Sequence, residues 1–380
     1  MTTCLSRPST GSTNPPEYTT QEEQQFELAR LGSSSSPSIL SAPPPYDDYD
    51  GPSSRPFWPT VHLQIQTAGK PWLSLPTPPR PEPIPVFSLH PDDPSTVAGA
   101  AAGAIPQFTS FRPERYSGSC YLQQTSSSGS STVVATTTYR FGPGRPPVVR
   151  LFSPFSSPSP AAVHHILYSS SHNNKFGDDD HNSHTTQYAE GEHQQHEGNE
   201  SGAWDTFTVS SLGLLTRAVG FRSRLGSFQW RYAGRGERRA FARELSASEI
   251  GGRGGGGAGK QPDIANMLVL ERVVRVAVAQ SGTSAAAGSR KDEEEVRTVV
   301  ARFVRGEDYR SPGSGASTAG NGGRLLLDLG IWEGEDGGKG DREMAVVMVV
   351  TTCLIMLKRE IDRRRAQQIA IMSGAASGGG

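Results

Sequence analysis

The stretch that decides the fold is Met344-Ala-Val-Val-Met-Val-Val-Thr-Thr-Cys-Leu-Ile-Met-Leu357, which contains no charged residue, glycine or proline. Charged residues flank it on both sides, from 341 to 343 and from 358 to 365. As a helix it would be about 21 Å long at ~1.5 Å per residue, whereas a membrane crossing needs roughly 20 residues. A helix that is apolar on every side must still be hidden from water. We therefore predict a helix buried inside its own protein.

Two alternative interpretations of this stretch remain open. Valine, threonine and isoleucine dominate residues 346–355 and favour strands. However, helix formers continue to Met372 without glycine or proline, which favours a helix. The basic residues that follow Leu357 also fit a tail anchor, in which 344–357 enters a membrane as a short segment beside a basic flank.

The composition indicates one folded domain of moderate size with disordered segments. The chain has 380 residues, of which 43 are glycine and 29 are proline, and its mean hydropathy is -0.48. The net charge of -1 gives no general attraction to nucleic acid or to membrane. The three cysteines are far apart and the N-terminus has no apolar signal core, so we expect a reducing, cytoplasmic location.

Short strand patterns fill the middle of the chain. Val61, Leu63 and Ile65 alternate with polar residues, which is typical of a half-buried strand. We predict further strands at 72–75, 86–89, 120–122, 132–141, 148–152, 204–209, 215–221, 227–232, 267–278, 296–304 and 324–329. Many strands followed by one apolar helix predict a mainly β fold, an antiparallel barrel that encloses the C-terminal helix.

Polar and glycine-rich segments set the predicted domain boundaries. Residues 1–55 form a disordered tail rich in proline and serine, and residues 56–372 form the barrel. Disordered insertions are expected near 153–202, 246–262, 280–294 and 305–323, and a flexible glycine-rich end at 373–380.

The tail contains the motif Pro-Pro-x-Tyr twice. The copies are Pro15-Pro16-Glu17-Tyr18 and Pro43-Pro44-Pro45-Tyr46. Prolines preset an extended helix that docks between aromatic side chains, and the tyrosine fills a neighbouring pocket. The pattern resembles the ligands of WW domains, which implies a WW-domain partner of the HECT-type ubiquitin ligase class. Chance occurrence in a proline-rich tail is the alternative.

A second candidate site lies in an arginine-rich run between residues 217 and 243. Arg235, Arg238 and Arg239 fall in a short segment that we predict to be a basic turn able to hold phosphate groups of anionic phospholipid. The alternative is a solvated face whose arginine stems cover apolar surface. Nucleic acid is not an expected partner.

Catalytic and metal-binding arrangements are not expected. Seven histidines lie between residues 164 and 196 beside several carboxylates, but we expect that segment to lack the fixed geometry that a metal site requires. No nucleophile with a base and no phosphate-cradling glycine loop is recognisable, so we predict a protein without cofactor or enzymatic activity.

Several segments resemble parts of uncharacterised proteins of filamentous fungi: residues 140–147, 216–221, 228–232 and 354–365. The order of elements is also remotely similar to the tubby C-terminal-like superfamily, which includes LURP-one-related proteins and phospholipid scramblases. That resemblance implies a strand barrel around a terminal hydrophobic helix, and a barrel surface that binds phosphoinositides through basic residues. Together these observations predict an intracellular adaptor, with a WW-binding tail and a barrel that touches anionic membrane. A tail-anchored membrane adaptor is the alternative.

Overall fold

The computed structural model describes residues 56–77, 81–89, 104–115, 118–139, 145–153, 156–159, 162–163, 165–167, 202–213, 216–250, 263–277, 293–333 and 338–377. These residues belong to a unit that spans Ser54–Gly380. The two Pro-Pro-x-Tyr motifs and the predicted tail, 1–55, lie outside the described residues.

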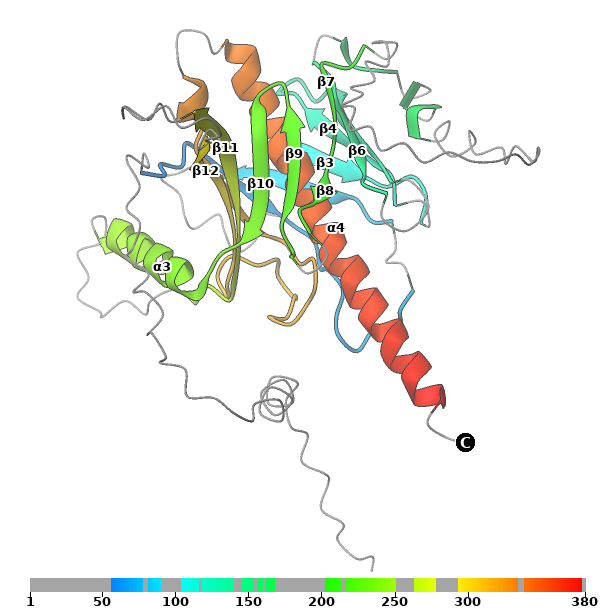
Figure 1. The fold of residues 1–380 in the computed structure, drawn as a ribbon. Helices are drawn as coiled ribbons and strands as arrows, with labels where there is room; N and C mark the ends of the chain where they lie inside the picture. Colours follow the sequence, from blue (N-terminus) through cyan, green and yellow to red (C-terminus); the bar gives the residue numbers. More distant parts are fainter. Residues whose placement is uncertain are drawn as a thin grey trace, which may run out of the picture. The chain divides into compact units, whose positions relative to one another are not determined.

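One antiparallel sheet of thirteen strands makes up most of the described chain (Figure 1). Its neighbours run in the order β7-β6-β5-β4-β3-β2-β1-β13-β12-β11-β10-β9-β8. The strands are β1 (Val61–Ile65), β2 (Ile84–Leu89), β3 (Phe108–Phe111), β4 (Cys120–Thr125), β5 (Ser131–Thr138), β6 (Val148–Leu151), β7 (Asp205–Thr208), β8 (Ser210–Ser211), β9 (Val219–Ser223), β10 (Gly226–Tyr232), β11 (Asn266–Ala277), β12 (Glu293–Arg305) and β13 (Gly323–Leu327).

The sheet curls until its two end strands meet, so that it forms a nearly closed barrel. The end strands β7 and β8 follow each other in the chain, and β7 also packs against β9. Phe207 of β7 stacks on Phe221 of β9 with ring centroids 5.1 Å apart. The backbone N–H of Arg224 donates to the Asp205 carboxylate at 2.9 Å. Side chains therefore close the seam where no strand ladder does, which confirms the predicted antiparallel barrel.

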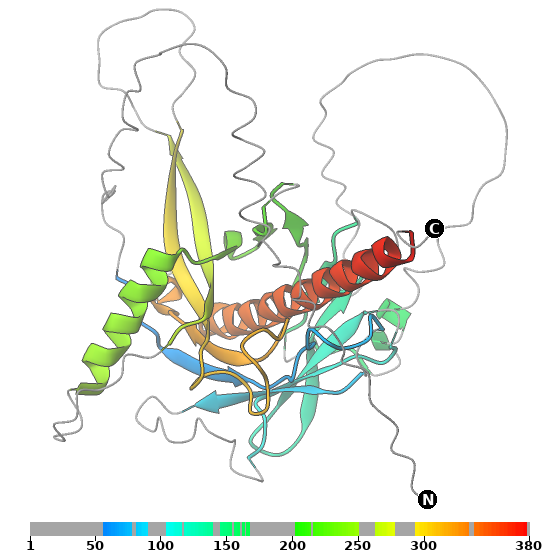
Figure 2. The same cartoon turned by 90° about the horizontal axis from the view of Figure 1, so that it is seen from below.

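Helix α4 (Lys339–Ser377) runs through this barrel, as Figures 1 and 2 show. The charge-free stretch predicted to be buried is buried: side chains from Met344 to Leu357 join the main core with Leu63, Phe108 and Trp230. A helix that is apolar all round can fill a barrel because strands surround it on every side. The segment 344–357 is thus sheltered by the chain itself and does not present the free apolar surface that the tail-anchor alternative requires.

No helix among the described residues combines the length and the apolarity that crossing a membrane demands.

Helix α3 (Arg235–Ile250) covers the outer face of the barrel. Its apolar side chains Phe241 and Ala242 form a second core cluster with Met267, Val304 and Leu326 of β11, β12 and β13. This corrects the prediction of a basic turn at 235–239, which is the first turn of α3. It also corrects the predicted insertion at 246–262, because residues 246–250 are helical. Burial of Phe241 and Ala242 stabilises the helix despite the glycine at 236.

The segment 305–323 was predicted to be a disordered insertion, and this is wrong. It is a packed loop across the outer face of β1. Gln64 of β1 donates a 3.0 Å hydrogen bond to the Tyr309 carbonyl, and the Ser311 hydroxyl accepts one of 2.9 Å from the backbone of Thr67. Its glycines permit close approach: a Cβ at Gly322 would lie 2.1 Å from the Ile65 carbonyl oxygen.

The remaining boundaries differ in smaller ways. Helix α4 continues to Ser377, so residues 373–377 of the predicted flexible end are helical. In the predicted insertion 153–202, Val163 and Leu167 pack on Val133, while residues 168–201 lie outside the described part. Most of the predicted insertion 280–294 also lies outside it, although β12 begins at Glu293. Residues 72–75 form a turn instead of the predicted strand, and β3 was not predicted.

Candidate functional site at the barrel mouth

A polar hollow of about 260 Å³ opens at the end of the barrel from which α4 emerges. Side chains from several separate segments line it: Arg217 shortly before β9, the end of β10, the start of β11, the end of β12, the 305–323 loop and the part of α4 between Glu360 and Gln367. Its arginines are Arg217, Arg305, Arg310, Arg363 and Arg364. A single carboxylate, that of Glu360, lines the same hollow.

Arg305 and Glu360 form a buried ion pair beside this hollow. Two guanidinium nitrogens of Arg305 donate to the two carboxylate oxygens, each at 2.6 Å, and only 5% and 10% of the two side chains is exposed. Glu360 also accepts hydrogen bonds from the Tyr232 hydroxyl at 2.6 Å and the Gly320 backbone at 3.0 Å. The carboxylate is therefore fully used inside the protein.

This network shifts the acid–base properties of its members. Burial alone would raise the pKa of Glu360, but the hydrogen bonds and charge of Arg305 outweigh burial and lower it below its usual value. Burial, followed by the negative charge of Glu360, raises the pKa of Tyr232 to about 12. Glu360 thus stays ionised, neutralises Arg305 and leaves the other arginines of the hollow without compensation from it.

Two of the other four arginines of the hollow, Arg217 and Arg364, are positioned by uncharged contacts. Arg217 lies over the ring of Tyr232, 5.8 Å from its centroid. Arg364 lies 4.4 Å from the centroid of Trp72 and donates to the Ser317 carbonyl at 3.1 Å. Arg310 and Arg363 line the hollow half-buried. Such contacts orient guanidinium groups without neutralising them.

Two further hollows continue this surface toward α3. The middle one shares Arg217, Tyr232 and Asn266 with the mouth and also contains Arg238. The outer one shares Arg238 and is lined by all three arginines singled out from the sequence, Arg235, Arg238 and Arg239. The structure therefore brings these three together, on the first turn of a helix. One exposed carboxylate, Asp263, lines the outer hollow with them.

We call the resulting surface the basic belt, comprising Arg217, Arg235, Arg238, Arg239, Arg310, Arg363 and Arg364. Within the described residues, none of the seven pairs with a carboxylate. Arg231 lies among them but is held by Glu237 and Glu271 at 2.7 and 2.6 Å, so it is excluded from the belt. Arginines that the described carboxylates do not pair with are suited to binding anions.

Sequence reasoning found only part of the belt. Arg310 was missed because it lies in the loop predicted to be disordered, and nothing in its local sequence indicates the packing of that loop. Arg363 and Arg364 carried a signal, since they follow the apolar stretch directly, but that signal was read as a flank for a membrane segment. Their role depends on α4 leaving the barrel at this mouth.

The other sequence-derived sites lie elsewhere. Pro15, Pro16, Tyr18, Pro43, Pro44 and Tyr46 are outside the described residues. Among the residues that the structure describes, no group of three or more histidine, cysteine, aspartate or glutamate side chains could hold a metal ion. Most of the histidine-rich segment lies beyond that part of the chain.

The chain matches no protein-family model, no curated protein and no solved structure.

Proposed function

We propose that this chain is a non-enzymatic intracellular interaction protein whose barrel binds anionic phospholipid through the basic belt. The observation that carries the proposal is the belt itself: seven arginines along adjoining hollows, none paired with a carboxylate among the described residues. A guanidinium group offers paired N–H donors that match the oxygens of a phosphate. Because helix, strand ends and packed loop fix the backbones of these arginines close together, only their side chains need ordering when phosphate binds.

One argument favours phospholipid over nucleic acid. The net charge of -1 gives no long-range attraction to either polyanion, so the positive charge acts only locally. The resemblance to the tubby C-terminal-like superfamily supports lipid, because basic residues on the barrel of those proteins bind phosphoinositides. The proposal includes a peripheral association with anionic membrane.

The test is sedimentation with vesicles of phosphatidylcholine, alone or with phosphatidylserine or a phosphoinositide. Two belt variants remove exposed or half-exposed arginines whose side chains form no hydrogen bond or ion pair with the described residues: Arg235→Ala with Arg239→Ala, and Arg310→Ala with Arg363→Ala. Each arginine near an anionic surface contributes about 1 kcal/mol, so each double variant is expected to bind roughly tenfold to thirtyfold more weakly.

A matched control removes the same charge far from the belt. Arg222 of β9 and Arg275 of β11 are exposed and lie toward the ends of these strands that point away from the mouth. Arg222→Ala with Arg275→Ala should bind like the unmodified chain. Binding that is equal with and without anionic lipid, or equal losses in the control and belt variants, would overturn the proposal.

A second candidate function concerns the N-terminal tail, and the two Pro-Pro-x-Tyr copies favour it. We propose that they bind WW domains, with a HECT-type ubiquitin ligase as the expected partner. Two copies on one tail give a partner with several WW domains an avidity advantage. Pulldown on a WW-domain array should lose signal stepwise in Tyr18→Ala and in Tyr18→Ala with Tyr46→Ala. Binding that survives the loss of both tyrosines would reject this function.

A further inference from the structure

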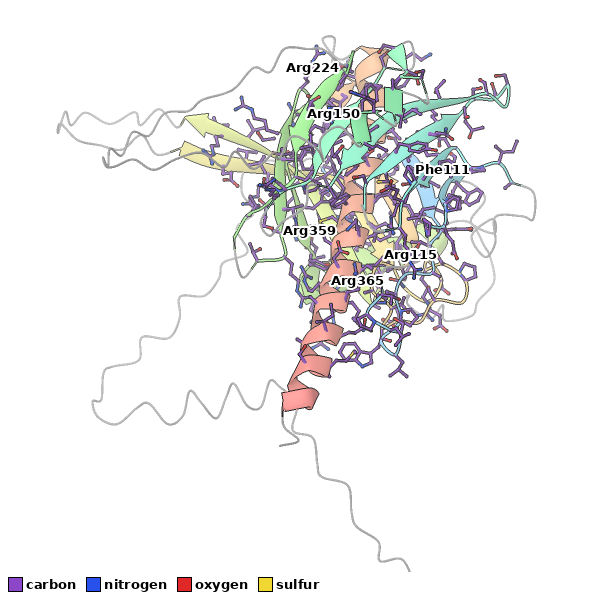
Figure 3. All side chains as sticks on the ribbon, turned by 90° about the vertical axis from the view of Figure 1, so that its right-hand side faces the viewer. Phe111, Arg115, Arg150, Arg224, Arg359 and Arg365 are labelled. Atoms are coloured by element: carbon purple, nitrogen blue, oxygen red, sulfur yellow. The ribbon has the colours of Figure 1, made fainter. Side chains whose placement is uncertain are left out.

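Next to the basic belt, a turn and the end of α4 are joined into one protruding structure. The last turns of α4 extend beyond the strand ends (Figure 1), past the labelled Arg365 in Figure 3. Gln368, which is buried, donates to the carbonyls of Trp72 at 2.7 Å and Ser74 at 2.9 Å. Arg365 donates to the Pro76 carbonyl at 3.2 Å. The turn 70–77 is thus fixed to the helix by its backbone.

The turn is also held from the barrel side. Lys70 is only 5% exposed, and its ammonium group donates to the carbonyls of Leu75 and Thr77. Its backbone pairs with Ala319 of the packed loop. Since the backbone carbonyls of the turn point inward to these donors, its apolar side chains face outward.

The side chains displayed there are large and apolar. Leu73 is 96% exposed, Leu75 72% and Trp72 47%, and on the end of α4 three more are at least half exposed. We call this set the apolar tip: Trp72, Leu73, Leu75, Ile369, Ile371 and Met372. It contains half of the exposed large apolar side chains among the described residues. Clustered exposure of this kind marks an interaction surface, whereas single exposed apolar residues are ordinary.

Positive charge lies beside the tip on the side of the barrel, at Arg364 and Arg365. Arg364 belongs to the basic belt and also lies over the ring of Trp72, so the belt and the tip meet at this contact. Ile369 and Met372 are five and eight residues further along α4, which places this part of the tip about 8–12 Å beyond Arg364 at ~1.5 Å per residue. Membrane-surface segments bury their apolar side chains by about 5–10 Å while basic residues remain at the headgroups. The nearer residues of the helical part of the tip project past Arg364 by a distance within this depth.

We infer that the apolar tip inserts into the acyl region of an anionic membrane while the basic belt contacts the lipid phosphates. This inference rests on the proposed lipid binding and adds the insertion and the orientation to it. A tryptophan beside arginines is typical of a membrane interface, where the indole lies at the headgroup level. The neighbouring arginines argue for an anionic bilayer as the occupant over an apolar groove of a protein, since a groove would have to desolvate them.

The experiment compares a tip variant with a matched apolar control on the same vesicles. Leu73→Ser with Leu75→Ser removes two exposed leucines, so folding should be unaffected, which thermal unfolding checks. The control, Val274→Ser with Val276→Ser, changes two exposed valines on β11 far from the mouth. We expect the tip variant to bind vesicles of phosphatidylcholine and phosphatidylserine roughly tenfold to hundredfold more weakly. The control should bind as the unmodified chain does.

A second readout reports insertion directly. A cysteine introduced as Leu73→Cys, in a background with Cys4→Ser and Cys120→Ser, carries an environment-sensitive dye. On anionic vesicles its emission should shift to the blue and be quenched by lipids labelled in the acyl chain, whereas the same dye at Val274→Cys should show neither change.

The outcomes separate this inference from the proposed function. Vesicle binding that is lost in the belt variants but unchanged in the tip variant, with no blue shift at position 73, leaves lipid binding intact and overturns insertion. It would assign the tip to a partner protein. No binding of the unmodified chain to anionic vesicles overturns both. Weaker binding by the tip variant together with the blue shift supports insertion.

Discussion

The indole N–H of Trp230 donates a 3.0 Å hydrogen bond to the Thr352 hydroxyl inside the barrel, and both side chains are completely buried. Trp230 belongs to β10 and Thr352 to α4, so the bond joins the wall to the helix. Apolar side chains cover α4 on all sides here and would tolerate more than one rotation of the helix. A polar pair inside an apolar core restricts that freedom, because any other rotation leaves a buried donor unsatisfied.

Removing this acceptor should destabilise the barrel. Thr352→Val keeps the branched shape but leaves the Trp230 donor without a partner, which we expect to lower the free energy of unfolding by about 1–3 kcal/mol. Thr351→Val is the matched control, since within the part of the chain that the structure describes the Thr351 hydroxyl bonds only to the Val347 carbonyl of its own helix. Urea denaturation measures both. Equal decreases in the free energy of unfolding of the two variants would show that the hydrogen bond between Trp230 and Thr352 does not stabilise the barrel.

Cys353 should report the release of α4 from the barrel. It is completely buried, and burial raises the pKa of its thiol. Alkylation of Cys353 in the native protein should therefore require opening of the barrel, and should follow its free energy. If Thr352→Val lowers that free energy by about 2 kcal/mol, labelling should accelerate roughly thirtyfold. Peptide mass spectrometry resolves the site, and rapid labelling in the unmodified chain would contradict the enclosed helix.

The ion pair at the mouth predicts a loss of stability in acid. The folded pKa of Glu360 lies below its unfolded value of about 4.5, so its contribution is present above that pH. The contribution disappears as pH falls through the folded value, because protonated Glu360 no longer neutralises Arg305. Urea unfolding between about pH 7 and pH 3 should show this decline.

Two variants test the source of that decline. Glu360→Gln leaves Arg305 buried without a counter-charge, so at neutral pH the free energy of unfolding should fall by about 3–5 kcal/mol. Its acid dependence should be flatter than that of the unmodified chain. Glu307→Gln, at an exposed position in the 305–323 loop, should change neither the stability at neutral pH nor its acid dependence. An unaltered acid decline in Glu360→Gln would assign the effect to other carboxylates.

Local patterns sufficed to predict most of the barrel. The alternation of Val61, Leu63 and Ile65 with polar residues predicts the inward face of β1, and the charge-free stretch 344–357 predicts the buried part of α4. The turn 72–75 misled because its mostly apolar sequence, Trp-Leu-Ser-Leu, resembles a short strand. Its backbone carbonyls are instead taken by Gln368, which is 296 residues away from Trp72 in the chain. No local pattern contains that partner.

The candidate site was harder to predict for the same reason. Glycine, serine and threonine dominate residues 311–323, a composition typical of disorder. Their order comes from distant contacts, such as the Ser311 hydroxyl with Thr67 and the Gly320 backbone with Glu360. Since Arg310 is placed by this loop, and Arg363 by the exit of α4, the belt exists only once the barrel has closed. The sequence shows the arginines but does not show that folding brings them close together.

Gly320 offers the sharpest test of how tightly the 305–323 loop packs against α4. Its backbone φ is +66°, and a Cβ there would lie 2.6 Å from the Leu357 carbonyl oxygen and 2.5 Å from Ile361. Gly320→Ala should therefore lower the free energy of unfolding by roughly 2–5 kcal/mol, from the left-handed backbone and the overlap with α4 together. Gly313→Ala is the matched control, because Gly313 has a φ of +75° in the same loop with nothing within 4 Å of the added carbon. It should lose only the backbone part, about 1–2 kcal/mol.

Because the Gly320 N–H also donates to Glu360, displacing the loop should weaken the ion pair between Glu360 and Arg305. Vesicle binding by the belt should then be reduced in Gly320→Ala, whereas Gly313→Ala should leave binding unchanged. Equal effects of the two substitutions on stability and binding would mean that the loop packs only loosely on α4 at Gly320.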